Sequence, residues 1–288
     1  MEQDLVLFGV IVPALIAFAV SLAPRAAWHG HRRDLPAVES WGPAAAIALA
    51  FLLSFSHVAQ AGDFGSERWH SLSSALMLAG LAAMLCWWHP PRGGFFLAMS
   101  VAFWSLLLLQ LPGHDGAASR LATASIGALL AMSIIPACRT PGAVAPVILA
   151  AAFLAMSAAA LASGHSKVAF MAMACGVLLA LLAIPASINR RFVLGPAAAG
   201  VAASALVACA VFGSAYVDVS AERHAWWWWA AALAPGLSVA PYLLGIAKDR
   251  PCARMTIAAI VVFIALAPGV VASLERLRAV AAELSQHE

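Results

Sequence analysis

Hydroxyl side chains next to two prolines are the feature of this chain best suited to bind a small molecule. Residues 234–242 read Ala-Pro-Gly-Leu-Ser-Val-Ala-Pro-Tyr and lie inside a long apolar run. Proline has no backbone N–H and weakens the preceding helical turn, so Pro235 and Pro241 predict a helix that is kinked or locally unwound. Broken helices of this kind form binding sites in membrane carriers. Ser238 and Tyr242 would then offer hydroxyl groups to a small solute.

Few other polar residues interrupt the apolar runs. His57 and Gln110 lie at comparable depth in the second and fourth runs, and Trp104 lies in the middle of the fourth. If the proline-containing segment binds a solute, Ser238 and Tyr242 should face an interior cavity, joined by Trp104 and Gln110. His57 and Gln110 would line an outward-facing polar vestibule. The alternative is that His57 serves packing, through a hydrogen bond to a neighbouring helix.

Histidines form a second pattern, because each even-numbered connection between runs carries one near a helix end, in addition to His57 in the second run. They are His57, His70, His114, His165 and His224. Imidazole binds transition metals and haem, so convergence of these loops would make a site. No HxxxH or HExxH spacing occurs, and none of the five cysteines forms a Cys-x-x-Cys pair. The preferred interpretation is therefore ordinary interfacial histidines, with no metal, no cofactor and no catalytic residue predicted.

The elements that carry these residues are membrane-spanning helices. Hydrophobic residues make up 64% of the 288, the mean hydropathy is +0.92, and the charged residues lie in short gaps between apolar runs. Runs of about 20 apolar residues match the thickness of a bilayer, and continuous apolarity indicates helices rather than barrel strands. An all-α polytopic bundle of ten helices is predicted, at residues 5–23, 41–60, 71–88, 94–112, 121–138, 143–163, 168–188, 193–216, 225–247 and 255–274.

Loop charge predicts the orientation of the bundle. The odd-numbered connections hold ten of the 16 Lys and Arg residues but only three of the 13 Asp and Glu residues. Because Lys and Arg concentrate in short cytoplasmic loops, these connections should face the cytoplasm. Both ends of the chain should then lie on the non-cytoplasmic side of a bacterial inner or plasma membrane.

Longer-range organisation is simple. Residues 1–288 form one integral membrane domain, and residues 275–288 read as an amphipathic tail at the outer surface. Division into five plus five helices gives halves of opposite orientation, and proline positions are compatible with an inverted repeat. The run Trp226–Trp229 points around the whole helix at about 100° per residue, which favours anchoring at the membrane interface over a ligand platform.

Three classes of function fit this architecture. The favoured one is a transporter or permease for a small uncharged or amphipathic solute. The second is a non-catalytic structural or assembly subunit of a larger membrane complex, and the third is a haem- or metal-handling protein acting at the outer face. The partners expected are the lipid bilayer and other membrane subunits or a second copy of the chain. Nucleic acid and nucleotides are excluded, because basic residues are spread thinly and no phosphate-binding glycine motif occurs.

Overall fold

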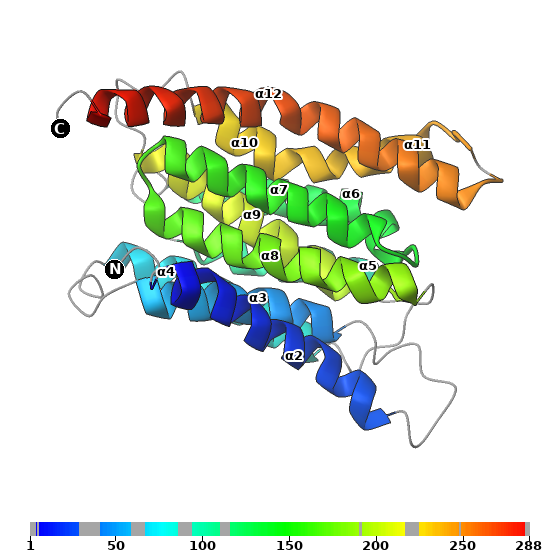
Figure 1. Ribbon diagram of the computed structural model, residues 1–288. Helices are drawn as coiled ribbons and strands as arrows, with labels where there is room; N and C mark the ends of the chain where they lie inside the picture. Colours follow the sequence, from blue (N-terminus) through cyan, green and yellow to red (C-terminus); the bar gives the residue numbers. More distant parts are fainter. Residues whose placement is uncertain are drawn as a thin grey trace.

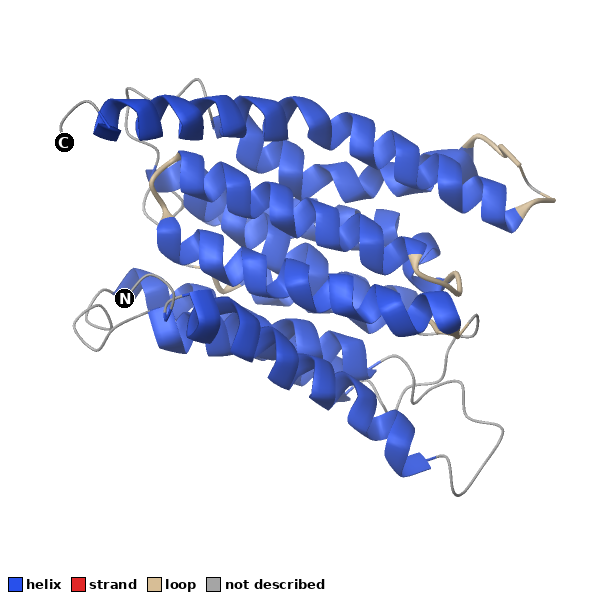
Figure 2. Ribbon diagram, viewed as in Figure 1, coloured by secondary structure: helices blue, strands red, loops and turns tan. Residues whose placement is uncertain are grey.

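The computed structural model of the chain is an all-α bundle. It describes residues 4, 6–28, 41–58, 67–85, 94–109, 116–189, 192–216, 225–247 and 249–285, and no β-strand occurs in these ranges (Figure 2). The all-α prediction is therefore confirmed. The elements are η1 (Leu7–Ile11, a π-helical turn), α2 (Val12–Trp28), α3 (Trp41–Val58), α4 (Glu67–Leu85), α5 (Gly94–Leu107), α6 (Ala117–Arg139), α7 (Val144–Ala162), α8 (Ser166–Ile188), α9 (Pro196–Tyr216), α10 (Ala225–Leu233), η6 (Ala234–Val239, a 3-10 helix), α11 (Ala240–Leu243) and α12 (Pro251–Ser285).

Length and apolarity make several of these helices compatible with a membrane. Within the described residues, five helical segments are long and apolar enough to cross a bilayer: Ala117–Arg139, Val144–Ala162, Ser166–Ile188, Pro196–Ala215 and Cys252–Ala279. Shorter apolar helices occupy Leu7–Leu22, Gly42–His57, Leu72–Ala82 and Phe95–Leu107. The chain thus has the character of an integral membrane protein.

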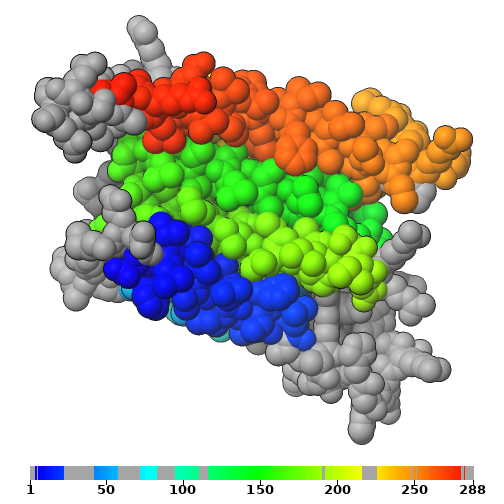
Figure 3. All heavy atoms as spheres, in the orientation of Figure 1, coloured from blue at the N-terminus to red at the C-terminus, as the bar shows by residue number. Residues whose placement is uncertain are grey.

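The helices pack in layers. One surface of the bundle shows α12, α7, α8 and α2 side by side, in that order (Figures 1 and 3). Behind this layer α9 packs against α3, α4, α5, α6 and α10. In the apolar part of α9, 94% of the residues are buried, compared with 22% for α12. The core of the bundle is therefore centred on α9, and α12 lies at its edge.

Small residues allow the close packing around α9. A Cβ atom on Gly200 would lie 2.8 Å from the backbone oxygen of Ala98 in α5, so only glycine permits this approach. Ser204 lies one turn further along α9, where its Oγ is 2.8 Å from Oγ of Ser105 in α5, and both serines are buried. Small side chains draw helices together in lipid, where apolar burial gives no driving force between them.

Two predicted elements end differently in the structure. The helix predicted at 94–112 is shorter in the structure: α5 ends at Leu107, and the N–H of Leu109 donates to the oxygen of Leu106 in the turn that follows, at 3.1 Å. The last predicted span and the tail form one continuous helix, α12, of 35 residues. Its extension contacts the bundle: Arg276 Nε donates to the oxygen of Ala162 at 2.8 Å, and Leu277 packs on a cluster of Ala159, Ala162 and Trp227.

Substitution of Gly200 tests the contact between α5 and α9. Gly200→Ala should destabilise the protein by about 1–3 kcal/mol, the usual cost of overpacking, because the new methyl group meets backbone rather than a flexible side chain. The measurement is thermal unfolding in detergent followed by circular dichroism. Gly116→Ala is the control, since nothing lies within 4 Å of its added Cβ. Equal unfolding temperatures for the two variants would contradict the close approach.

Candidate functional site

The candidate site is the interrupted helix formed by α10, η6 and α11. Pro235 lies in the first turn of η6 and Pro241 in the first turn of α11. Each proline removes an N–H that would bond to the carbonyl four residues earlier, and the chain between them tightens into a 3-10 helix. The local unwinding predicted from the two prolines is present.

Ser238 lies at the buried side of this interruption. The η6 segment packs against α6 and α12, and a Cβ atom on Gly236 would lie 3.2 Å from Leu130 of α6. The Ser238 side chain is 1% exposed, and among the residues that the structure describes its Oγ has no hydrogen-bond partner. A buried hydroxyl without a partner typically costs 1–3 kcal/mol, so this position carries an unmet demand for a hydrogen bond.

Tyr242 is half-buried and connects three helices at one end of the bundle. Its OH lies 3.0 Å from Oγ1 of Thr140, which directly follows α6, and 2.9 Å from Sδ of Met255 in α12. The Arg254 guanidinium lies 5.0 Å from the centre of the Tyr242 ring, within range of a cation–π interaction. Tyr242 therefore acts first as a junction between α6, α11 and α12.

Hydrogen atoms limit how this junction is bonded. Thr140 Oγ1 also lies 2.8 Å from the backbone oxygen of Pro136. The Thr140 and Tyr242 hydroxyls carry one hydrogen each, whereas three contacts are within hydrogen-bond distance. Only two can be formed at once. A solute that accepts a hydrogen bond from Tyr242 would take the hydrogen that Tyr242 otherwise donates to Met255 or Thr140.

The other predicted site residues are placed elsewhere. Trp104 is 59% exposed on the outer side of α5, and the described parts of α5 and η6 do not form a packed helix pair. His57 is exposed in the last turn of α3, where its ring centre lies 5.6 Å from that of Phe8. Gln110 lies outside the described residues. Ser238 and Tyr242 are thus brought together by one segment, while Trp104 and His57 do not join them there.

Two of the consecutive tryptophans are core residues, which corrects their interpretation as interfacial anchors. Trp227 and Trp228 are 5% and 0% exposed, whereas Trp226 is 48% exposed. The Trp228 ring occupies the space beside Gly213 of α9, where a Cβ atom would overlap it. The sequence analysis did not predict this contact, because Gly213 and Trp228 lie on different helices and no local pattern links them.

The histidines that the sequence analysis placed at one face are only partly described by the structure. The His165 ring, at the start of α8, lies 5.9 Å from the Trp228 ring and 6.3 Å from the Phe212 ring. His114, His224 and the side chain of His70 lie outside the described residues. Within the part of the chain that is described, no three His, Cys, Asp or Glu residues group as a metal site would require.

A shallow depression lies beside the broken helix rather than at Ser238. It is partly open to the surface, encloses no room for a water molecule and lies between α7, α10 and α12. Its lining is apolar and mostly small: Ala155, Ala159, Trp227, Ala230, Ala231, Leu266, Gly269 and Val270. Among these side chains only the indole of Trp227 carries a polar group, so the depression offers mainly van der Waals contact.

Removal of the Thr140 hydroxyl tests the junction. Thr140→Val should lower stability by about 1 kcal/mol, the value of one hydrogen bond, because it removes the hydroxyl that reaches both Pro136 and Tyr242, while Tyr242 keeps Met255 as a partner. Thr256→Val is the matched control, since the exposed Thr256 hydroxyl also bonds to the carbonyl four residues earlier, that of Cys252 within α12. Thermal unfolding of both variants, alone and with Tyr242→Phe, gives the coupling. Full additivity of Thr140→Val and Tyr242→Phe would show that the two hydroxyls do not interact.

Comparison of the chain with models of protein families, with curated proteins and with solved structures gives no match in any of the three. A function for this chain therefore has to be inferred from its own residues and their arrangement.

Proposed function

We propose that this chain is a multi-pass membrane transporter that binds a small uncharged or amphipathic solute at the broken helix α10–η6–α11. The observation that carries the proposal is the buried, unpartnered Ser238 hydroxyl on a 3-10 segment between α6 and α12. A solute group that bonded to this hydroxyl would recover the free energy lost by its burial.

The broken helix distinguishes Ser238 from other buried serines. The hydroxyls of Ser54 in α3 and Ser157 in α7 are also buried and find no partner in the described part of the chain. Both lie in continuous α-helices, where a serine can turn its hydroxyl to the carbonyl three or four residues earlier at little cost. At Ser238, Pro235 and Pro241 have already disturbed the backbone pattern, as in the binding segments of discontinuous carrier helices.

The surroundings support an uncharged solute. Two residues before Ser238, a Cβ atom on Gly236 would lie 3.2 Å from Leu130 and 3.6 Å from the uncharged Ser133, and Pro235 and Pro241 are buried. A charge brought into such surroundings would need a counter-charge, and the apolar spans of this chain contain no acidic or basic residue at mid-depth. Hydroxyl groups at Ser238 and Tyr242 suit a solute that forms one or two neutral hydrogen bonds.

A structural or assembly subunit is the second candidate function. The dense packing of α5 on α9 and the dry depression beside α10 favour it, because a scaffold needs no internal path. The two candidates differ in one measurable property, which is whether water or a water-soluble reagent reaches Ser238.

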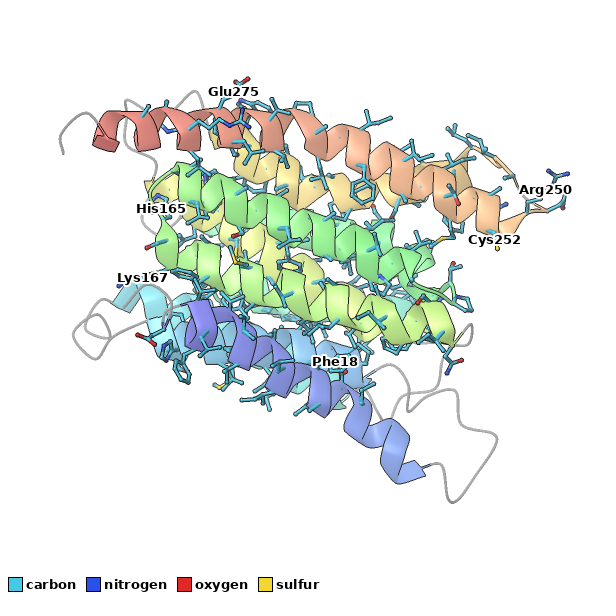
Figure 4. All side chains as sticks on the ribbon, in the orientation of Figure 1. Phe18, His165, Lys167, Arg250, Cys252 and Glu275 are labelled. Atoms are coloured by element: carbon cyan, nitrogen blue, oxygen red, sulfur yellow. The ribbon has the colours of Figure 1, made fainter. Side chains whose placement is uncertain are left out.

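The ten-span topology, with both ends of the chain on the non-cytoplasmic side, is part of the proposal. The first described helical turns and the last turn of α12 lie at the same end of the bundle (Figure 1). His165 and Lys167 lie at that end, whereas Arg250 and Cys252 lie at the other (Figure 4). The inverted repeat receives no such support: α5 and α6 pack on α9, whereas no comparable packing joins their counterparts, α10 and α12, to the described part of α4.

Reporter fusions test this topology. Fusions at Arg32, Arg139 and Lys248 should report the cytoplasm, and fusions at Ser66, His165 and the C-terminal end should report the opposite side, because basic loops are retained inside. Alkaline phosphatase and fluorescent protein fusions give complementary signals. A cytoplasmic location for both His165 and Arg139 would exclude a crossing by α7.

Cysteine accessibility tests the binding segment. In a chain with Cys86→Ser and Cys252→Ser, the described cysteines that remain are buried. Ser238→Cys should react with a small water-soluble methanethiosulfonate, because a transport cycle must expose the site to water. The measurement is the mass shift of the purified protein in vesicles.

Ser157→Cys is the matched control, since Ser157 is equally buried and unpartnered but lies in the continuous helix α7. It should stay unmodified. Equal and slow modification of the two cysteines would contradict solute binding at η6 and favour the structural subunit.

A further inference from the structure

The turn between α11 and α12 exposes large apolar side chains at one end of the bundle. Leu243 and Leu244 are 78% and 72% exposed, and Ile246 is 40% exposed. They lie beyond the last buried position of the broken helix, Pro241. Apolar side chains with this exposure at a helix end are suited to an apolar neighbour outside the bundle.

This turn is held in a defined shape. Backbone N–H groups of Leu244 and Ile246 donate to the oxygens of Ala240 and Pro241, at 2.9 and 3.0 Å. Ala247 has a φ of +51°, a left-handed conformation that is strained for a residue other than glycine. Arg254 fastens the turn from the other side, because its Nε donates to the Ile246 oxygen at 3.1 Å. A strained backbone conformation that surrounding hydrogen bonds hold in place is typical of functional segments.

Basic residues follow the apolar ones directly. Arg250 is exposed and projects at the tip of the connection (Figure 4). Asp249 is exposed beside it, Lys248 precedes both in the sequence, and Arg254 follows one turn into α12, so the segment carries a net positive charge. A guanidinium has five N–H donors, which allows Arg254 to hold the turn and an anion together.

We propose that this turn binds an anionic phospholipid. The phosphate of the headgroup is bound by Arg250 and Arg254, while Leu243, Leu244 and Ile246 lie among the acyl chains. The order of the residues matches the order of the bilayer, with the apolar side chains towards the bundle, Arg254 beside them and Arg250 at the tip. A negative headgroup complements the net charge of the segment, and each basic residue near such a surface contributes on the order of 1 kcal/mol. This site is separate from solute binding and does not depend on it.

Lipid retention by the full chain tests the proposal. The protein is purified, placed in nanodiscs of phosphatidylcholine with a minor share of phosphatidylglycerol, and the lipid that stays bound after exchange into detergent is quantified by mass spectrometry. The wild type should retain phosphatidylglycerol in excess of its share. Arg250→Gln should lower this enrichment about fivefold, the effect of one basic residue at an anionic surface.

Arg139→Gln is the matched control, because Arg139 is an exposed arginine at the end of α6 and is not part of the turn. It should keep the wild-type enrichment, and inorganic phosphate added during the exchange should not remove the lipid. Equal losses in the two variants would show general surface charge instead of a site. Absence of enrichment in the wild type, no effect of Arg250→Gln, or displacement by phosphate would each overturn the proposal.

Discussion

The close approach of α9 to its neighbours is the constraint on which the rest of this bundle depends. Lipid is as apolar as the helix surface, so the burial of apolar side chains gives no driving force for association within the membrane. Helices therefore associate through van der Waals contact at short range and through hydrogen bonds between them. Gly200 permits that contact with α5, and the Ser105 and Ser204 hydroxyls bond across it. Because α9 also packs against α3, α4, α6 and α10, a displacement of this one helix would disturb most of the others.

Helix positions were largely accessible from the sequence, because a span in lipid must be apolar along its length and must satisfy its own backbone hydrogen bonds. The 3-10 segment at 234–239 could also be predicted, because a proline disturbs the backbone hydrogen bonds of its own helix. The end of α5 at Leu107 could not be predicted, because Leu108 and Leu109 are as apolar as the residues before them. Apolarity indicates depth in the membrane and does not mark the residue at which a helix turns.

The candidate site was only partly predictable, since its contacts join distant parts of the chain. Ser238 and Tyr242 were found through nearby prolines, but nothing local pointed to Thr140 or Met255 as partners of Tyr242. The direction of each side chain was also hidden. Trp104 faces outwards and Trp228 inwards although both sit in equally apolar surroundings along the sequence. Which face of a helix is covered depends on its neighbours, and a chain that is apolar on every face carries little record of them.

The length of α12 has a consequence for the membrane in which the protein resides. The whole helix, Pro251–Ser285, has 35 residues and rises about 52 Å, whereas its part without charged residues, 255–274, rises about 30 Å, which is roughly the thickness of a bilayer core. In a thinner or thicker bilayer an isolated helix would adjust this match by tilting freely. Here Arg276 and Leu277 fasten α12 to α7, so its tilt is coupled to that of the bundle. Bilayer thickness therefore acts on the whole molecule, and membranes of different thickness should change its inclination and the deformation of the lipid around it.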